Sequence, residues 1–95
     1  MAGYIALVHK DAGTSYGVSF PDVPGCVSAG DTFEEALANA AEALAGHLAL
    51  MAEDGDPIPA PRDFEAIKAD RALADDLDGA VLAFVTPLPE IRAAE

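Results

Sequence analysis

Cysteine and histidine are scarce in this 95-residue sequence, and each scarcity excludes a class of protein. The single cysteine, Cys26, cannot form an intramolecular disulfide, and no charged segment followed by an apolar run indicates a signal peptide, so we expect a cytoplasmic protein. The only two histidines, His9 and His47, are not spaced as metal ligands. We therefore expect no metal site and no other cofactor.

Positive charge is also rare, with five Lys and Arg against 17 Asp and Glu and a formal net charge of −12. The resulting field repels phosphates and attracts cationic surfaces, so we expect no direct binding to nucleic acid. Long apolar runs are missing as well. The most apolar region, residues 36–51, is interrupted by polar residues and falls short of the roughly 18 apolar residues that span a bilayer, so we expect no membrane association.

The length provides for one compact domain. Its core is small, because 21 of the apolar residues are Ala, and oligomerisation would help to stabilise it. Negative charge is concentrated in residues 53–78, which hold nine acidic and three basic side chains. This segment is interpreted either as a solvated face or as a docking surface for a basic protein.

Four segments have the composition of strands: residues 4–9, 16–20, 26–29 and 80–85. The first two are separated by a polar loop and are predicted to form a hairpin. Residues 21–25, Pro-Asp-Val-Pro-Gly, form a rigid corner at which regular strand pairing stops. The last segment is apolar on both faces, which indicates a strand covered on both sides, by a helix and by something else such as a partner subunit.

One long helix is predicted after the third strand. Thr32 and Glu35 have the spacing of a capping box, which marks the start of the helix. Leu50 lies outside the apolar stripe and is either a scattered surface leucine or an oligomer contact. The apolar stripe that should pack on the sheet comprises Phe33, Leu37, Ala40, Ala41, Leu44, Leu48 and Met51.

The chain from this helix to the last strand is predicted in three parts. Residues 53–61 carry three prolines at alternate positions, which indicates an extended strap. Residues 63–69 have the pattern of a short helix with Phe64 and Ile67 inward, and residues 75–79 that of a turn. The connection is long enough for a crossover, so the last strand is expected to join parallel to a neighbour. The predicted fold is α+β: a four-stranded mixed sheet with one long helix packed on one face.

No constellation of catalytic residues is present. Cys26 and the serines lack the neighbours that activate a nucleophile, and phosphate-binding glycine loops are absent. The acids Asp31, Glu34 and Glu35 converge, but they fall in the first turn of the predicted helix, where the backbone dipole favours negative charge. We predict that the chain is not an enzyme.

Residues 16–37, together with residues 4–8, 40–44 and 58–61, resemble the HicB family of antitoxins. The resemblance implies a partial ribonuclease H-like fold and an antitoxin of a type II toxin–antitoxin pair. Its partner would be a small basic toxin of the HicA type, a ribonuclease that cleaves messenger RNA. The residues of the shared motif, for which we expect structural roles, include Tyr16, Phe20, Pro21, Pro24, Gly25 and Thr32.

Within this resemblance, the acidic surface would be steered onto the cationic RNA-binding face of the toxin and would cover its active site. Inhibition would then be steric and electrostatic. The predicted toxin-facing acids are Asp22, Asp31, Glu34 and Glu35, followed as second choice by Glu53, Asp54 and Asp56.

Two other functions are compatible with a small α+β domain of this kind. A ribonuclease H-like nuclease needs an acidic residue in the middle of its first strand, and residues 4–9 contain none. A stand-alone oligomeric interaction module without a toxin is the alternative to the antitoxin. An exposed sheet edge and the apolar last strand favour a homo-oligomer, a dimer or a tetramer, by strand pairing or helix packing.

The expected domain comprises residues 1–86, followed by a short tail of residues 87–95. Members of the family commonly carry a C-terminal DNA-binding unit, which a tail of this length cannot form. Residues 88–92 have the pattern of the first strand of such a unit, cut short. Repression of its own operon is therefore not predicted for this chain.

Overall fold

A computed structural model describes residues 3–10 and 13–87 of the chain. The expected order of three strands, a long helix, a short helix and a last strand is found, with two further short helices before the last strand. The elements are β1 (Tyr4–Lys10), β2 (Tyr16–Ser19), β3 (Val27–Gly30), α1 (Phe33–Glu53), α2 (Phe64–Ala69), the 3₁₀ helix η1 (Arg71–Leu73), α3 (Ala74–Leu77) and β4 (Val81–Val85).

The four strands form one sheet in the order β3-β2-β1-β4, and all three pairings are antiparallel. The expected α+β class and the hairpin of β1 and β2 are confirmed, whereas the expectation of a mixed sheet with a parallel last strand is wrong. The reason is the path of the chain after α1. The chain returns to the end of the sheet where β1 finishes, so β4 begins at Val81 opposite Val8 and runs back along β1.

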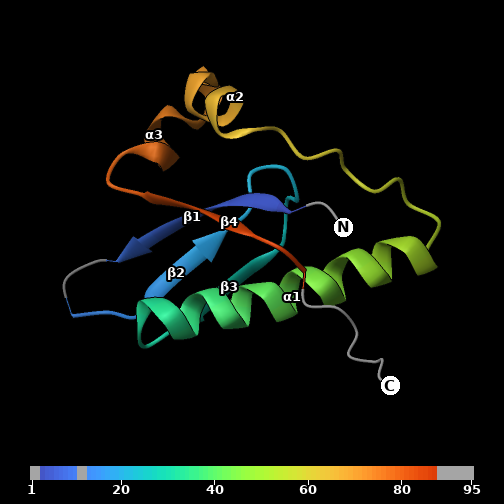
Figure 1. Cartoon of the computed structure of the whole chain (residues 1–95), viewed down its shortest axis with the longest axis horizontal. Helices are drawn as coiled ribbons and strands as arrows, with labels where there is room; N and C mark the ends of the chain where they lie inside the picture. The colour runs from blue at the N-terminus through green and yellow to red at the C-terminus, as the bar shows by residue number, and fades with distance from the viewer. Residues whose placement is uncertain (1–2, 11–12, 88–95) are drawn as a thin grey trace.

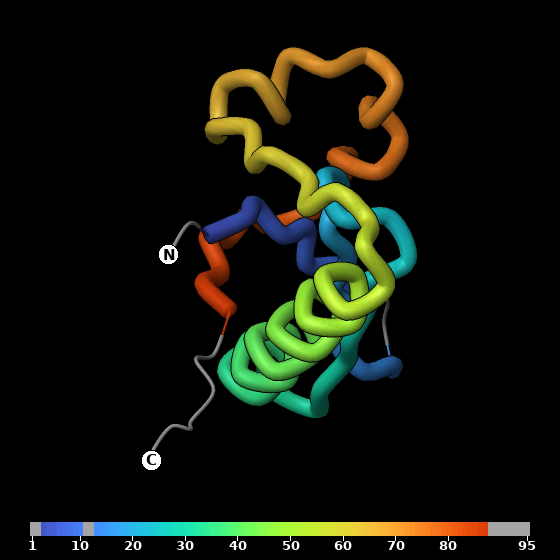
Figure 2. Tube along the Cα trace, turned by 90° about the vertical axis from the view of Figure 1, so that its right-hand side faces the viewer, coloured from blue at the N-terminus to red at the C-terminus, as the bar shows by residue number. Residues whose placement is uncertain are grey.

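The sheet lies between two helical layers (Figure 1, Figure 2). The long helix α1 covers one face, mainly over β3 and β2. The short helices α2, η1 and α3 cover part of the other face, where Ile67 is fully buried against Ile5 and Leu7 of β1. The sequence led us to expect α1 as the only helical cover. Instead, helices cover both faces of the sheet.

Local sequence explains where α1 begins and how it packs. The Thr32 hydroxyl accepts a hydrogen bond from the Glu35 amide at 3.0 Å, as predicted for a helix N-cap. The buried centre of α1 consists of Ala36, Ala40 and Leu44, four residues apart. Ala36 was not in the predicted stripe. It is buried because α1 approaches β3 so closely that no side chain fits at Gly30.

The helical segment on the opposite face differs from its prediction in two ways. Ile67 is buried as expected, but Phe64 is 43% exposed, so its predicted inward orientation is wrong. Phe64 is the first residue of a helix of only six residues, and it lines an open hollow beside β4 instead of entering the buried core. The predicted turn at residues 75–79 contains a short helix, α3, up to Leu77, and the turn proper follows at Gly79.

Candidate functional site

The motif that carries the resemblance forms the start of the sheet and the corner between β2 and β3. Two successive turns build this corner, with the Val23 amide donating to the Phe20 carbonyl and the Cys26 amide to the Val23 carbonyl. Gly25 has a φ of +90°, which a side chain would strain. The edge of the Tyr16 ring meets Phe33 of α1, with ring centroids 6.0 Å apart. These contacts are structural.

Asp22, in this corner, binds Arg62, the residue that follows the strap. Its carboxylate accepts hydrogen bonds from the backbone amide and from Nε of Arg62, both at 2.7 Å. Arg62 also donates to Asp70 at 2.8 Å, and this contact lowers the pKa of the Asp70 carboxyl below its ordinary value. Because only 9% of the Asp22 side chain is exposed, the expectation that Asp22 presents a free charge is wrong.

The acids predicted at the start of α1 are close together and exposed, and two of them have a structural role. The Glu35 carboxylate accepts a hydrogen bond from the Asp31 amide at 2.8 Å, which completes the cap. The Asp31 carboxylate lies 3.4 Å from the Ser15 hydroxyl, which donates to it. Glu34 is exposed in the first turn, where the helix dipole favours it.

The acids at the end of α1 have no such role. The helix ends in a Schellman motif, in which Gly55 has a φ of +78° and the Asp56 amide donates to the Met51 carbonyl at 2.9 Å. The backbone alone therefore caps this end. The exposed carboxylates of Glu53, Asp54 and Asp56 lie against the negative end of the helix dipole, and the last turn contains no basic residue.

The two acidic groups lie at opposite ends of one helix. With a rise of about 1.5 Å per residue, the 21 residues of α1 separate them by about 30 Å. Both groups were predicted from the sequence to face the toxin, but the structure does not bring them together. A single small contact surface cannot include both.

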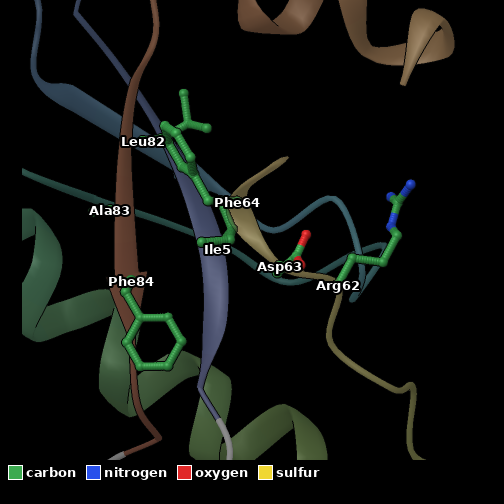
Figure 3. Close-up of a pocket in the computed structure, with 7 residues that line it drawn as sticks. All are labelled: Ile5, Arg62, Asp63, Phe64, Leu82, Ala83 and Phe84. Atoms are coloured by element: carbon green, nitrogen blue, oxygen red, sulfur yellow. The ribbon is translucent and has the colours of Figure 1, made fainter. Parts of the chain in front are cut away.

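An apolar hollow beside β4 was not predicted as a site. Its volume is about 450 Å³, and its lining is mainly apolar, with Arg62 and Asp63 at one side (Figure 3). The apolar lining residues are Ile5, Phe64, Leu82, Ala83 and Phe84. A second hollow of about 450 Å³ adjoins it and shares Phe64 and Leu82. Phe84 is 68% exposed. The signal in the sequence was the apolar character of both faces of residues 80–85, which indicated a cover from outside the chain.

The remaining candidate groups have structural roles. His9 donates from Nε2 to the Asp76 carbonyl at 2.6 Å and so ties α3 to β1. Cys26 is buried, and burial raises the pKa of its thiol. Within residues 3–10 and 13–87, no three His, Cys, Asp or Glu side chains are placed to hold a metal ion. No helix in the same residues has the length and apolarity to cross a membrane.

A family model described as the HicB-like antitoxin of bacterial toxin–antitoxin systems matches residues 4–88. The chain belongs to this family. The predicted resemblance to HicB antitoxins is thereby confirmed, as is the prediction that the chain is not an enzyme, because the family is one of antitoxins.

Individual HicB proteins agree with this assignment. The chain is 48% identical over 46 residues to antitoxin HicB 1 of Photorhabdus laumondii, which is 48% of this chain and 30% of that protein. The crystal structure of the Burkholderia pseudomallei antitoxin HicB is similar with a TM-score of 0.77 and 36% identity, over 90% of this chain and 63% of that chain. A chain of a HicA3 and HicB3 toxin–antitoxin complex gives a TM-score of 0.73 and 33% identity, over 92% and 99% of the respective chains.

The chain spans less than two thirds of the Photorhabdus and Burkholderia antitoxins. The family match ends at residue 88, close to the predicted boundary between the domain and its tail. The pattern noted in residues 88–92, predicted as a strand of a DNA-binding unit, lies outside the described residues.

Proposed function

We propose that this chain is the antitoxin of a toxin–antitoxin pair and that it neutralises a basic HicA-type ribonuclease by covering the toxin's RNA-binding face. The observation that carries the proposal is the match to HicB-like antitoxins over residues 4–88. Its likeness to 99% of a chain in a HicA3 and HicB3 complex supports a role in toxin binding for the HicB-like domain alone. The net charge of −12 suits a cationic partner.

Among the acidic groups, we propose that Glu53, Asp54 and Asp56 make the main contact with the toxin. Each carboxylate near a helix C-terminus costs about 0.3–1 kcal/mol relative to a neutral side chain. These side chains make no capping hydrogen bond that would offset this cost, because backbone groups cap this end of α1. By contrast, Asp31, Glu34 and Glu35 stabilise the start of α1, and Asp22 is committed to Arg62.

The proposal ranks the end of α1 above its start, which reverses the order expected from the sequence. The start of α1 remains the second candidate, with Glu34 as its least constrained acid. The contact would be electrostatic, so it would form rapidly at low ionic strength and weaken in salt. No residue of this chain would take part in chemistry.

The test is binding between this chain and the purified product of a neighbouring gene that encodes a short basic protein. The triple variant Glu53→Gln, Asp54→Asn, Asp56→Asn should weaken the affinity about tenfold or more. It should also raise the melting temperature slightly, because it removes unfavourable charge from the helix end. A structural role for the acids would lower both quantities together.

A matched triple variant, Asp75→Asn, Asp76→Asn, Asp78→Asn, removes the same number of charges from exposed positions near α3. It controls for long-range attraction and should leave the affinity within about threefold of the original. Equal loss in both triple variants would show that only net charge matters. Failure of the unaltered chain to bind the basic protein at low salt, or to relieve growth arrest on co-expression, would overturn the antitoxin proposal.

A further inference from the structure

Leu50 is an exposed apolar residue near the end of α1. Its side chain is 58% exposed, and it lies outside the buried centre of the helix. Residues three and four positions apart are neighbours on a helix surface, so Leu50 lies beside Glu53 and beside Asp54, the residue that caps the helix. A large apolar side chain therefore lies among the acids that we propose as the main toxin contact.

The turn that ends α1 does not cover Leu50. In a Schellman motif, the residue after the glycine is frequently apolar and packs against the last turn of the helix. Here the residue after Gly55 is Asp56, whose amide closes the motif on the Met51 carbonyl. A carboxylate thus occupies the position from which an apolar side chain would cover Leu50 and Met51.

The preceding turn of α1 leaves Leu50 open as well. Gly46 precedes Leu50 by four residues and is its neighbour on the helix surface. A Cβ at Gly46 would meet nothing within 4 Å outside the helix backbone, so packing among the described residues does not require glycine here. Glycine inside a helix lowers its stability relative to alanine.

This end of α1 thus departs from local rules of helix stability in several places. A single exposed leucine is common on protein surfaces. Here, however, it is combined with acids at the negative end of the helix dipole, with an acid in place of the apolar residue of the Schellman motif, and with a helix glycine that nothing in the fold explains. Departures that the fold does not compensate are expected at functional sites.

We propose that Leu50 is the apolar anchor of the toxin contact, an inference that rests on the proposed function. Lys or Arg side chains of the toxin lay their aliphatic stems on Leu50 and pair their charged ends with Glu53, Asp54 and Asp56. Such side chains readily cover apolar surface while the charged end stays at its rim. The apolar centre excludes water from the surrounding ion pairs and thereby strengthens them.

Charge identifies a basic protein as the occupant. Two copies of this chain that met at this surface would bring their carboxylates together, and the last turn of α1 contains no basic residue that could offset the repulsion. A purely apolar partner would bury the carboxylates without a cation, which is costly. A surface rich in Lys and Arg supplies both the aliphatic stems and the positive charges.

The test compares two substitutions of Leu50. Leu50→Gln removes the apolar character at a similar side-chain size and helix propensity, whereas Leu50→Met keeps it. Leu50→Gln should bind the purified basic product of the neighbouring gene about tenfold more weakly, mainly through faster dissociation, and Leu50→Met within about threefold of the unaltered chain. Val81→Gln is the control and should change little. Val81 is similarly exposed, at 53%, and is the first residue of β4, which begins far from the end of α1 (Figure 1).

Ionic strength separates the apolar anchor from the charges. The affinity of Leu50→Gln should fall with salt as steeply as that of the unaltered chain, because all carboxylates remain. The triple variant of Glu53, Asp54 and Asp56 should show a shallower dependence on salt. Circular dichroism and melting curves establish that each variant is folded, and replacement of the largely exposed Leu50 should leave the melting temperature nearly unchanged.

The outcomes distinguish this inference from the antitoxin proposal. Unchanged affinity of Leu50→Gln, with weak binding of the triple variant, overturns the anchor and leaves the antitoxin proposal standing. Equal loss in Val81→Gln also overturns the anchor. A Leu50→Gln variant with altered light scattering and unaltered toxin affinity would make Leu50 a contact between copies and overturn it too. If the unaltered chain does not bind the basic protein at low salt, the antitoxin proposal fails, and the anchor fails with it.

Discussion

The two faces of the sheet are held in different ways. On the face of α1, apolar side chains fill the interface, with Leu44 fully buried and the helix backbone close to Gly30. On the face of α2 and α3, the buried core is reduced to Ile5, Leu7 and Ile67, and two hollows remain beside it. Polar contacts add to this core: His9 of β1 binds the Asp76 carbonyl of α3, Tyr4 of β1 donates to Pro59 of the strap, and Arg62 binds Asp22 in the corner between β2 and β3.

The difference indicates that the two faces contribute differently to the stability of this small domain. A continuous apolar core gives the α1 face most of its stability and holds it in one arrangement. The opposite layer has few buried contacts and several exposed hydrogen bonds, which is typical of regions that open locally. We expect the α1 face to determine whether the chain folds. The other face should determine how firmly the segment between α1 and β4 is held.

Leu44→Ala and Ile67→Ala test this difference with two fully buried aliphatic residues. Leu44→Ala should lower the free energy of unfolding by about 4 kcal/mol, because the close-packed α1 face cannot fill the cavity. Ile67→Ala should cost about 2–3 kcal/mol, because α2 can settle toward the adjoining hollows. Chemical denaturation measures both values.

Hydrogen exchange separates the two effects further. Ile67→Ala should increase amide exchange in α2, η1 and α3 while α1 and β2 stay protected. Leu44→Ala should increase exchange throughout the domain. Identical exchange patterns in the two variants would contradict the proposed difference between the faces.

Gly30→Ala and Gly3→Ala sharpen the comparison at the level of single contacts. A Cβ on Gly30 would clash with the Ala36 backbone and lie 2.7 Å from its Cα, so α1 would have to move. A Cβ on Gly3 would lie 2.5 Å from the ring of Phe84, which is largely exposed and can turn away, although the Val85 carbonyl stays 2.9 Å from it. Melting curves should show a loss of about 3 kcal/mol for Gly30→Ala and about 1–2 kcal/mol for Gly3→Ala.

Arg62→Gln tests the polar attachment of the second layer. It breaks the contacts of the Arg62 side chain with Asp22 and Asp70 and leaves the shielded Asp22 carboxylate without its cation. We expect a smaller fall in melting temperature than for Ile67→Ala but faster cleavage of the strap, residues 53–61, by a nonspecific protease. Arg71→Gln removes a charge from an exposed position and is the control. Unchanged cleavage in Arg62→Gln would show that the strap is held by its other contacts.

The sequence predicted the parts of the fold that depend on local chemistry. The capping pair Thr32 and Glu35 fixes the start of α1, and the prolines of the strap exclude a helix there. The direction of β4 could not be predicted in this way. It depends on where a long connection returns to the sheet, and apolar composition is compatible with either direction.

The candidate site also has parts that local sequence predicts and parts that depend on long-range contacts. The exposed acids of α1 follow from the helix pattern, but their separation of about 30 Å depends on the length of the helix. The structural role of Asp22 depends on Arg62, which lies 40 residues away in the chain, and no local pattern links the two. The open edge of β4 was indicated by its apolar faces, but the strand order was needed to place it at the edge.

The pH dependence of stability should show the smallest of these effects. Asp70 has a lowered pKa, mainly because Arg62 donates to it and then because of the Ala72 amide. A carboxyl group with a lower pKa in the folded chain stabilises the fold above its ordinary pKa of 3.8, and this contribution is lost as the pH falls through the lowered value. Asp70→Asn should therefore destabilise the chain at pH 5–7, and the gap to the unaltered chain should close below pH 3.8.

Only the difference between the two proteins isolates this effect, because protonation of the other acids also relieves the repulsion among them. Asp75→Asn is the matched control, since it removes an equivalent charge from α3 without breaking an ion pair among the described residues. Unfolding curves at several pH values between 7 and 3 measure the difference in stability between each variant and the unaltered chain. A gap for Asp70→Asn that stays constant down to pH 3 would show that the bond from Arg62 adds nothing to stability. The second layer would then depend on its small apolar core alone.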